Sequence, residues 1–373
     1  MDKNNCSGSQ WPAVERVMAA AIAARAFPGA VLLAGQGDRI FFHRAYGQAD
    51  LFRRRPMTFD TVFDLASVTK PLATTLVAMH LAARGVLELD RPVADTLSEY
   101  FPAAAPRYTP RMLLSHTAGL AAWRPFFQTL ARVPLSARRS LLLEMLSREP
   151  AISPPGSTTL YSDVGFLILA WLLEVLSGRP LAETLEKNIY PEMGGEGLFF
   201  PAISGSSGHH YAAGQLCPWR ARLLTGVVDD ENAFILGGAA GHAGLFGTAL
   251  AVHRVVAALW QCFSGDIALS AFSPETVRAF LSPPAGGGRA LGFDVPSGDQ
   301  PSCGAYFSTP TIGHLGFTGV SFWLELTTGV HIVLLTNRTH PYRFAEGIKN
   351  FRPAIFDALM AAVRRSPGGL AAD

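Results

Sequence analysis

Apolar residues recur at helical spacing near both ends of the chain. Over Trp11 to Phe27 this spacing predicts an amphipathic helix, which Pro28-Gly29 terminates. The same pattern predicts a second helix over Pro71 to Arg84. A closing helix is predicted over Phe344 to Arg364. Helices therefore flank the sequence on both sides.

Two β-hairpins are predicted, one toward each end of the sequence. In the first, the apolar runs Ala30 to Ala34 and Ile40 to Tyr46 flank a Gly-Gln-Gly-Asp turn. The second joins Ser321 to Leu326 with Val330 to Thr336 through a Thr-Thr-Gly turn. Glycine and short polar residues between two apolar runs are the usual signal of a tight hairpin turn.

Helical patterns dominate the middle of the chain, from about Asp90 to Gly244, where many Pro and Gly residues interrupt them. The simplest assembly is one antiparallel sheet built from both ends of the sequence and flanked by the terminal helices. We therefore expect an α/β fold of the α+β type with an inserted, mostly helical lobe. The sheet lobe would comprise residues 11–90 plus 245–365 and the helical lobe residues 91–244, with a site in the cleft between them.

The composition excludes several classes of protein. The chain has 31 Lys and Arg against 29 Asp and Glu, a formal net charge of +2, which is too small for a nucleic-acid binder held by phosphate contacts. A hydrophobic content of 49% excludes intrinsic disorder. The 4 Cys residues form no CxxC pair, so we expect reduced thiols and neither a disulfide framework nor a metal site.

The hydropathy pattern does not favour a membrane span. The richest apolar stretch, Phe166 to Leu176, contains Glu174 and is shorter than the roughly 20 apolar residues that cross a bilayer. Met1 to Trp11 is polar and shows no secretory signal. We therefore expect a cytoplasmic protein that acts on a small molecule or a short peptide. The sequence leaves the oligomeric state open.

The first chemical motif is Ser67-x-x-Lys70, at the start of a predicted helix. This spacing is close to one helical turn, so the lysine amine is expected beside the serine hydroxyl. A serine hydroxyl is a weak nucleophile that needs an adjacent base, and a lysine can serve when its pKa is lowered. The N-terminus of a helix adds free N–H groups suited to a developing oxyanion. Alone, the motif is equally compatible with Ser67 as a helix N-cap.

Two further motifs follow in chain order. Tyr-Ser-Asp at 161–163 precedes an apolar helical pattern, and His-Leu-Gly at 314–316 opens the C-terminal hairpin region. Ser-x-x-Lys, then Tyr-x-Asn, then Lys/His-x-Gly is the motif set of the penicillin-recognising serine hydrolases. The chain therefore resembles the serine β-lactamase and penicillin-binding-protein superfamily. It is most similar to the class C-like branch, which also holds D-Ala-D-Ala carboxypeptidases, D-aminopeptidases and esterases. Met112 to Leu120 and Val228 to Phe246 resemble further segments of that branch.

The resemblance implies a role for each motif residue. Ser67 would attack a carbonyl and become acylated, while Lys70 and Tyr161 would take its proton and return it to the leaving group. The backbone N–H groups of Ser67 and Phe317 would form the oxyanion hole. Asp163, His314 and Gly316 would line the substrate-binding wall. The family needs no metal and no organic cofactor.

Two residues depart from the family pattern. Asp163 stands where many members have Asn, and a carboxylate beside Lys70 would raise the lysine pKa, which favours Tyr161 as the base. His314 replaces Lys, and a neutral imidazole attracts a substrate carboxylate less strongly than an ammonium does. Efficient β-lactamase activity is therefore disfavoured. The expected reaction is hydrolysis of a D-amino-acid peptide or muropeptide-type amide, or of a small ester.

Two alternatives stay open at this point: a weak β-lactamase or penicillin-binding protein, and a ligand-binding protein on the same fold without catalysis. Other polar residues are given structural roles. We expect His116 and His242 to make structural hydrogen bonds and His209-His210 to lie in an exposed loop. The acidic run at 229–231 is expected to form a wall or a helix cap.

Overall fold

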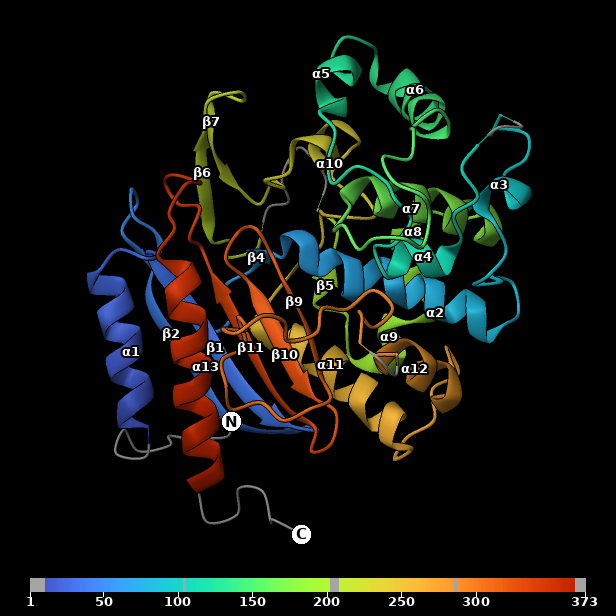
Figure 1. Cartoon of the computed structure of the whole chain (residues 1–373). Coiled ribbons are helices and arrows are strands. Elements are labelled where there is room, and N and C mark those ends of the chain that lie inside the picture. The colour runs from blue at the N-terminus through green and yellow to red at the C-terminus, as the bar shows by residue number, and fades with distance from the viewer. Residues whose placement is uncertain (1–10, 103–104, 202–207, 285–286, 366–373) are drawn as a thin grey trace.

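The structure is a computed structural model that describes residues 11–102, 105–201, 208–284 and 287–365. Its centre is a six-stranded antiparallel sheet in the order β3-β2-β1-β11-β10-β9. Figure 1 shows α1 and α13 side by side on one face of this sheet, while most of the other helices gather on the opposite side. Strands from both ends of the chain meet in this sheet, so the predicted fold class is confirmed.

The strands of the main sheet come from two segments that are far apart in the sequence. The central pair is β1 with β11, in a register from Ala30 opposite Thr336 to Gln36 opposite Val330. Both predicted hairpins are present as β1–β2 and β10–β11. The strand bounds are β1 (Gly29–Gln36), β2 (Arg39–Asp50), β3 (Arg55–Pro56), β9 (Thr311–Leu315), β10 (Ser321–Glu325) and β11 (Val330–Thr336).

Strand β1 is buried on both faces, and its side chains alternate between two hydrophobic cores. Val31 and Leu33 belong to the larger core under the helical part of the molecule. Ala30, Leu32 and Ala34 belong to the smaller core beneath α1 and α13. This period of two explains why β1 reads as a continuous apolar run, because each face of the strand is covered by helices.

Within the residues that the structure describes, five short strands lie outside the main sheet. They are β4 (Phe63–Asp64), β5 (Leu198–Phe199), β6 (Ala213–Cys217), β7 (Arg222–Thr225) and β8 (Phe246–Gly247). The α-helices are α1 (Pro12–Ala23), α2 (Thr75–Ala83), α3 (Val93–Thr96), α4 (Pro110–Leu114), α5 (Phe126–Leu130), α6 (Leu135–Ser147), α7 (Asp163–Ser177), α8 (Leu181–Asn188), α9 (Tyr190–Met193), α10 (Glu231–Ile235), α11 (Ala249–Ser264), α12 (Pro274–Leu281) and α13 (Ile348–Arg365). Strand β4 pairs with β8 and leads directly to Ser67.

Two predicted helix boundaries were wrong for local reasons. Helix α1 ends at Ala23, short of Phe27, because Arg25 adopts a left-handed conformation. The N–H of Ala26 then donates to Ala21 O and closes a Schellman-type cap. The closing helix α13 begins at Ile348, four residues later than predicted, because carbonyls before it, including Ala345 O, accept hydrogen bonds from Arg338.

Helix α7 shows how the sequence sets a helix at the site. The Ser162 hydroxyl accepts the N–H of Gly165 as the N-cap, and Gly178 ends the helix in a left-handed conformation. Ten consecutive residues from Val164 to Leu173 are buried. This helix therefore fixes the loop that carries Tyr161 against the core.

No single helix in the described part of the chain is both long and apolar enough to cross a membrane, but α7 and α8 meet these criteria together with a bend of 61°.

Cys217, Cys262 and Cys303 are free, buried thiols, as expected, and Cys6 lies outside the described residues. The division into a sheet lobe and a helical lobe stays a prediction.

Candidate active site

Ser67 lies where the chain leaves β4 and enters a continuous helical run. A 3₁₀ turn, Ala66–Val68, is followed by a widened turn, Lys70–Thr74, and then by α2. Ser67 is the middle residue of the 3₁₀ turn and does not cap a helix. Ala66 has a φ of +46°, a left-handed conformation that non-glycine residues rarely adopt and that strains the backbone. The turn places Ser67 Oγ 3.2 Å from Lys70 Nζ.

Lys70 is a fully buried cation with one carboxylate partner. Its Nζ lies 2.6 Å from Asp163 Oδ1 and donates to the carbonyl of His242 at 3.3 Å. Burial lowers the pKa of Lys70, but the Asp163 carboxylate and the Tyr161 hydroxyl outweigh burial, and the net shift is upward. Lys70 is therefore an ammonium at neutral pH. The upward shift expected from Asp163 in place of Asn is present.

Tyr161 lies over this cation, with its ring centre 4.7 Å from Lys70 Nζ. The His116 ring packs at a tilt of 36° against the Tyr161 ring, 4.5 Å between centres, and its Nδ1 accepts the N–H of Ser162 at 3.0 Å. Burial holds the pKa of His116 well below its ordinary value, so the ring is neutral. His116 thus supports Tyr161 structurally, as predicted. Burial raises the pKa of Tyr161, and the charge of Lys70 opposes that rise.

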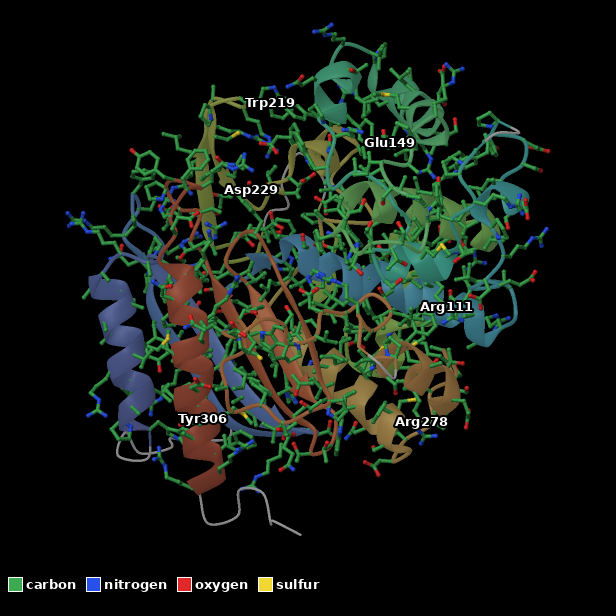
Figure 2. The ribbon with its side chains drawn as sticks, viewed as in Figure 1. Arg111, Glu149, Trp219, Asp229, Arg278 and Tyr306 are labelled. Atoms are coloured by element: carbon green, nitrogen blue, oxygen red, sulfur yellow. The ribbon has the colours of Figure 1, made fainter. Side chains whose placement is uncertain are left out.

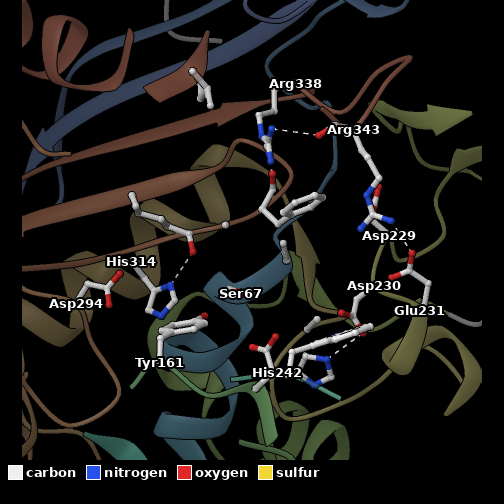
Figure 3. Close-up of a pocket in the computed structure, with 18 of the residues that line it drawn as sticks. Ser67, Tyr161, Asp229, Asp230, Glu231, His242, Asp294, His314, Arg338 and Arg343 are labelled. Carbon is white, nitrogen blue, oxygen red and sulfur yellow. Dashed lines mark hydrogen bonds and ion pairs between the residues drawn. The ribbon is translucent and has the colours of Figure 1, made fainter. Parts of the chain in front are cut away.

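His314 on β9 faces the Tyr161 ring across the cavity, with 6.0 Å between ring centres (Figure 3). Its Nδ1 donates to Leu315 O at 2.8 Å, which leaves Nε2 as an acceptor. Burial lowers the pKa of His314, so the imidazole is neutral. Among the described residues, Nε2 has no hydrogen-bond partner. It is therefore a buried acceptor without a partner in the wall of the cavity.

The residue after the His-Leu-Gly motif lies at the mouth of the cavity. The N–H of Gly316 donates to Val320 O, which turns the chain so that Phe317 follows β9 as an exposed residue. The guanidinium groups of Arg338 and Arg343 lie 4.7 Å and 4.9 Å from the Phe317 ring centre. The ring is therefore within cation–π distance of two arginines.

These residues line one cavity of about 820 Å³. Figure 3 shows Ser67 between Tyr161 and His314 on one side and Asp229, Asp230 and Glu231 on the other. The cavity is lined by Ala66, Ser67, Trp123, Phe127, Tyr161, Asp163, Asp229, Asp230, Glu231, His242, Ala243, Asp294, His314, Leu315, Gly316, Phe317, Arg338, Arg343, Glu346, Ile348, Lys349 and Arg352. The structure therefore brings together all seven residues named from the motifs, with Lys70 buried directly behind Ser67.

The acidic run forms one wall of the cavity and also caps a helix. In Figure 2, Asp229 lies between β6 and α10. Asp230 caps α10, and its carboxylate lies 2.9 Å from His242 Nε2. Burial alone would raise the pKa of Asp230, but the contact with His242 outweighs burial, and the pKa falls to about 2. Glu231 pairs with Arg343 at 2.6 Å. The prediction of a wall and cap, with His242 in a structural contact, is thus correct.

The cavity is also lined by arginines that the sequence patterns did not reveal. Arg352 on α13 is only 7% exposed, and its Nη2 donates to Gly316 O at 3.2 Å and to Val320 O at 2.9 Å. Arg338 donates to Phe317 O at 2.7 Å. Burial lowers the pKa of Arg352 to about 10, so it stays charged at neutral pH. Within the described ranges, neither arginine forms an ion pair with a carboxylate.

Asp64 is a second residue that the motifs did not reveal. One carboxylate oxygen accepts the N–H of Ala66 at 2.9 Å and the other accepts the N–H of Asp229 at 2.6 Å. The Thr318 hydroxyl donates to Asp64 O at 2.7 Å. Burial raises the pKa of this carboxyl to about 7, against the two N–H donors. Asp64 thus joins the Ser67 turn, the acidic wall and the loop after β9.

Sequence spacing gave no signal for Arg338 or Arg352, because both reach the site through the fold; Asp64 is three residues before Ser67, but its contacts with Asp229 and Thr318 also depend on the fold. No group of His, Cys, Asp or Glu in the described part of the chain could hold a metal ion. His209 is exposed and His210 is half-buried, with His210 Nδ1 at 2.9 Å from the Thr58 hydroxyl. The exposed loop predicted there is correct for His209.

Comparison with known proteins shows which family this chain resembles. The Beta-lactamase family model matches residues 14–352. A protein of Escherichia coli (strain K12) named "Putative D-alanyl-D-alanine carboxypeptidase" is 30% identical over 353 residues, covering 84% of this chain and 79% of that protein.

Two solved structures share the fold at lower identity. A penicillin-binding protein homologue from Pyrococcus abyssi, described as octameric, has a TM-score of 0.73 at 20% identity and covers 96% of this chain and 78% of its own. EstCE1, described as a hydrolase with promiscuous acyltransferase activity, has a TM-score of 0.74 at 24% identity and covers 94% of this chain and 98% of its own. The family match spans most of the residues, and this chain belongs to the beta-lactamase family.

Proposed function

We propose that this protein is a serine hydrolase that cleaves the last peptide bond of a D-amino-acid peptide. The reaction would pass through an acyl-enzyme on Ser67. The observation that carries the proposal is the cluster of Ser67, Lys70, Tyr161 and Asp163, which opens onto a cavity of about 820 Å³. A nucleophile beside a charged lysine and a phenol is the arrangement that acyl transfer needs. A protein that only binds a ligand has no need of this cluster.

In the proposed reaction, Tyr161 accepts the Ser67 proton as Ser67 Oγ forms a bond to the substrate carbonyl carbon. Burial raises the pKa of Tyr161 overall, so the neutral phenol is its resting form; the charged Lys70, held by Asp163, opposes that rise and favours the phenolate that accepts this proton. The backbone N–H groups of Ser67 and Phe317 stabilise the oxyanion. When the C–N bond breaks, Tyr161 returns the proton to the leaving amine. Water then attacks the ester and regenerates Ser67.

The arginines favour a peptide with a free carboxylate over a neutral ester. Arg352 and Arg338 are charged and lie beside the loop that carries the Phe317 N–H, and their hydrogen bonds to described residues go to backbone carbonyls. A buried guanidinium without a counter-ion is costly, so a substrate carboxylate would be stabilised there. The D-alanyl-D-alanine carboxypeptidase name carried by a 30% identical relative supports the same substrate class.

A small ester is the second candidate, because the aromatic rings of Trp123 and Phe127 line the same cavity. An apolar ester would pack against them without using the arginines. The cytoplasmic location expected from the sequence stays a prediction, which cell fractionation tests.

The test uses a matched pair of N-acylated peptides ending in D-Ala-D-Ala, one with a free carboxylate and one amidated, together with a small ester. We expect wild-type protein to hydrolyse the free acid fastest and a serine-reactive phosphonate to label Ser67, as read by intact mass. Ser67→Ala should abolish both signals, whereas Ser157→Ala, on an exposed loop, should leave them unchanged. Equal labelling of Ser67→Ala would overturn the assignment, and preference for the ester would move the proposal to the second candidate.

A further inference from the structure

The three most exposed large apolar side chains in the described part of the chain lie at one end of the molecule. They are Phe344 at 83%, Tyr342 at 71% and Phe52 at 62% exposure. Phe52 belongs to the turn between β2 and β3, while Tyr342 and Phe344 belong to the segment between β11 and α13. Figure 1 shows this turn and this segment at the same end of the main sheet, near the end of α1.

Side-chain contacts join the two segments into one surface. The Phe52 ring packs edge-on against His340 at 5.3 Å, and the N–H of Leu51 donates to His340 Nε2 at 3.0 Å. Beside them lies an apolar cavity of about 680 Å³, lined in part by Phe27, Leu51 and Tyr342. We call this surface, made of Leu51, Phe52, Tyr342, Phe344 and this cavity, the aromatic end.

Arginines surround the aromatic end. Arg53 and Arg54 follow Phe52 directly, and Arg25 lines the cavity from the end of α1. Arg53 is 72% exposed at its side chain and lies 3.9 Å from Asp50, a long contact for an ion pair. Arg25 and Arg54 are exposed and form no ion pair with any described residue. The surface therefore combines apolar tips with an excess of positive charge.

We propose that the aromatic end docks onto an anionic lipid surface. Aromatic side chains insert at the headgroup level, and neighbouring arginines attract anionic lipids. Exposed aromatics of this kind are otherwise unfavourable on a soluble surface. A second protein chain would fit the apolar part equally well, but it would not explain unpaired arginines around it, whereas anionic lipid matches both features by charge complementarity.

The docking surface is joined to the catalytic cavity by one segment. Arg338 lines both the apolar cavity and the catalytic cavity, and Ala345 O accepts its Nη1 at 2.7 Å. The segment that carries Tyr342 and Phe344 thus also holds Arg343 against Glu231. A protein docked through this surface would keep its catalytic cavity beside the membrane.

The test is co-sedimentation of the full chain with vesicles. One set contains phosphatidylcholine alone, and the other contains about one quarter phosphatidylglycerol. We expect binding to the anionic vesicles only. Salt at about 0.5 M should weaken this binding, because it shortens the range over which the arginines attract the anionic lipids. A Phe52→Ser, Tyr342→Ser, Phe344→Ser variant should bind at least about tenfold more weakly, and so should Arg25→Gln, Arg53→Gln, Arg54→Gln.

A Leu135→Ser, Ile152→Ser variant is the matched control, because both residues are exposed apolar side chains outside the aromatic end. It should bind like wild type. Failure of wild type to bind anionic vesicles overturns the proposal, and so does an equal loss in the control variant. A wild-type dimer that the serine variant dissociates, without vesicle binding, would assign the surface to a second copy instead. Hydrolysis of a soluble substrate should be unchanged in every variant, which separates this proposal from the proposed function.

Discussion

Two buried polar clusters in this protein differ in charge: one holds an ion pair and the other is neutral. Lys70 is fully buried and keeps its charge, because Asp163 lies 2.6 Å from its Nζ. His253 on α11 and His331 on β11 are also buried, with His253 Nδ1 at 2.7 Å from His331 Nε2. Burial lowers their pKa values to about 4 and about 3, so both are neutral.

The difference lies in the partners and in access to a cavity. His331 Nδ1 donates to Gly329 O, so its Nε2 must accept from His253, and the pair is satisfied without any charge. The Lys70 cluster instead places a charge behind Ser67 and Tyr161, which line the catalytic cavity. Burial alone therefore does not fix a charge state. A counter-ion retains the charge, and contact with a cavity makes it usable in chemistry.

The largest expected effect comes from removing the Lys70 charge. Lys70→Met should slow acylation of Ser67 by about 1,000-fold or more, because Tyr161 loses the cation that stabilises its phenolate form. Stability should fall only modestly, since the Asp163 side chain is 20% exposed and keeps contact with water. Intact-mass time courses with the phosphonate measure the rate.

The matched control for that variant is Lys187→Met. Lys187 also contacts a carboxylate, Glu183 at 2.8 Å, but on the surface. It should acylate like wild type. Acylation of Lys70→Met within about tenfold of wild type would show that the buried charge is not used in the reaction.

Asp64→Asn should lower kcat by about 10- to 100-fold with little change in KM. The two N–H donors of Ala66 and Asp229 both need an acceptor, and an amide offers only one oxygen. The Ser67 turn would then lose its fixed geometry. Steady-state kinetics and a thermal melt check this, with exposed Asp60→Asn as the control. A lower melting temperature together with a higher KM would instead indicate general loosening of the fold.

Arg352→Gln should raise KM by about tenfold for a peptide with a free C-terminal carboxylate and leave the amidated peptide unchanged. Loss of a charge-assisted hydrogen bond has about this size. Arg365→Gln, on the same helix but exposed, should change neither substrate. Equal effects of Arg352→Gln on both peptides would argue that the arginine only supports the loop at Gly316.

The histidine pair should affect stability and not activity. A histidine with a lowered folded pKa stays neutral in the folded protein while the unfolded chain binds a proton, so its stabilising effect is complete above the ordinary pKa of 6.5. That stability is lost as pH falls toward about 4 for His253 and about 3 for His331. Asp38 opposes the shift of His253, and His43 adds to it.

Denaturant unfolding of wild type between pH 7 and pH 4 should therefore show a loss on the order of a few kcal/mol. His331→Gln should flatten that pH dependence while hydrolysis at pH 7 stays near wild type. His209→Gln, an exposed histidine, serves as the control. An unchanged pH dependence in His331→Gln would show that other groups govern acid sensitivity.

Much of the fold follows from local patterns. Two hairpins with turn residues between apolar runs, and helices at both ends, were enough to predict an antiparallel sheet covered by terminal helices. Boundaries were less predictable, because the left-handed Arg25 and the Arg338 contacts with backbone carbonyls leave no mark in hydrophobic spacing. These features depend on hydrogen bonds that form only when the chain is packed.

The sequence by itself determined which chemistry the chain carries. Ser67 and Lys70 are one helical turn apart, so their contact is local, and the Tyr-Ser-Asp and His-Leu-Gly motifs identified the superfamily. Only the tertiary structure decided how closely Asp163 approaches Lys70, the contacts of Asp64 with Asp229 and Thr318, and the presence of Arg352 at the site. The physical reason is that desolvation and Coulomb interactions act through space. They depend on which distant segments the fold brings within a few ångströms of each other.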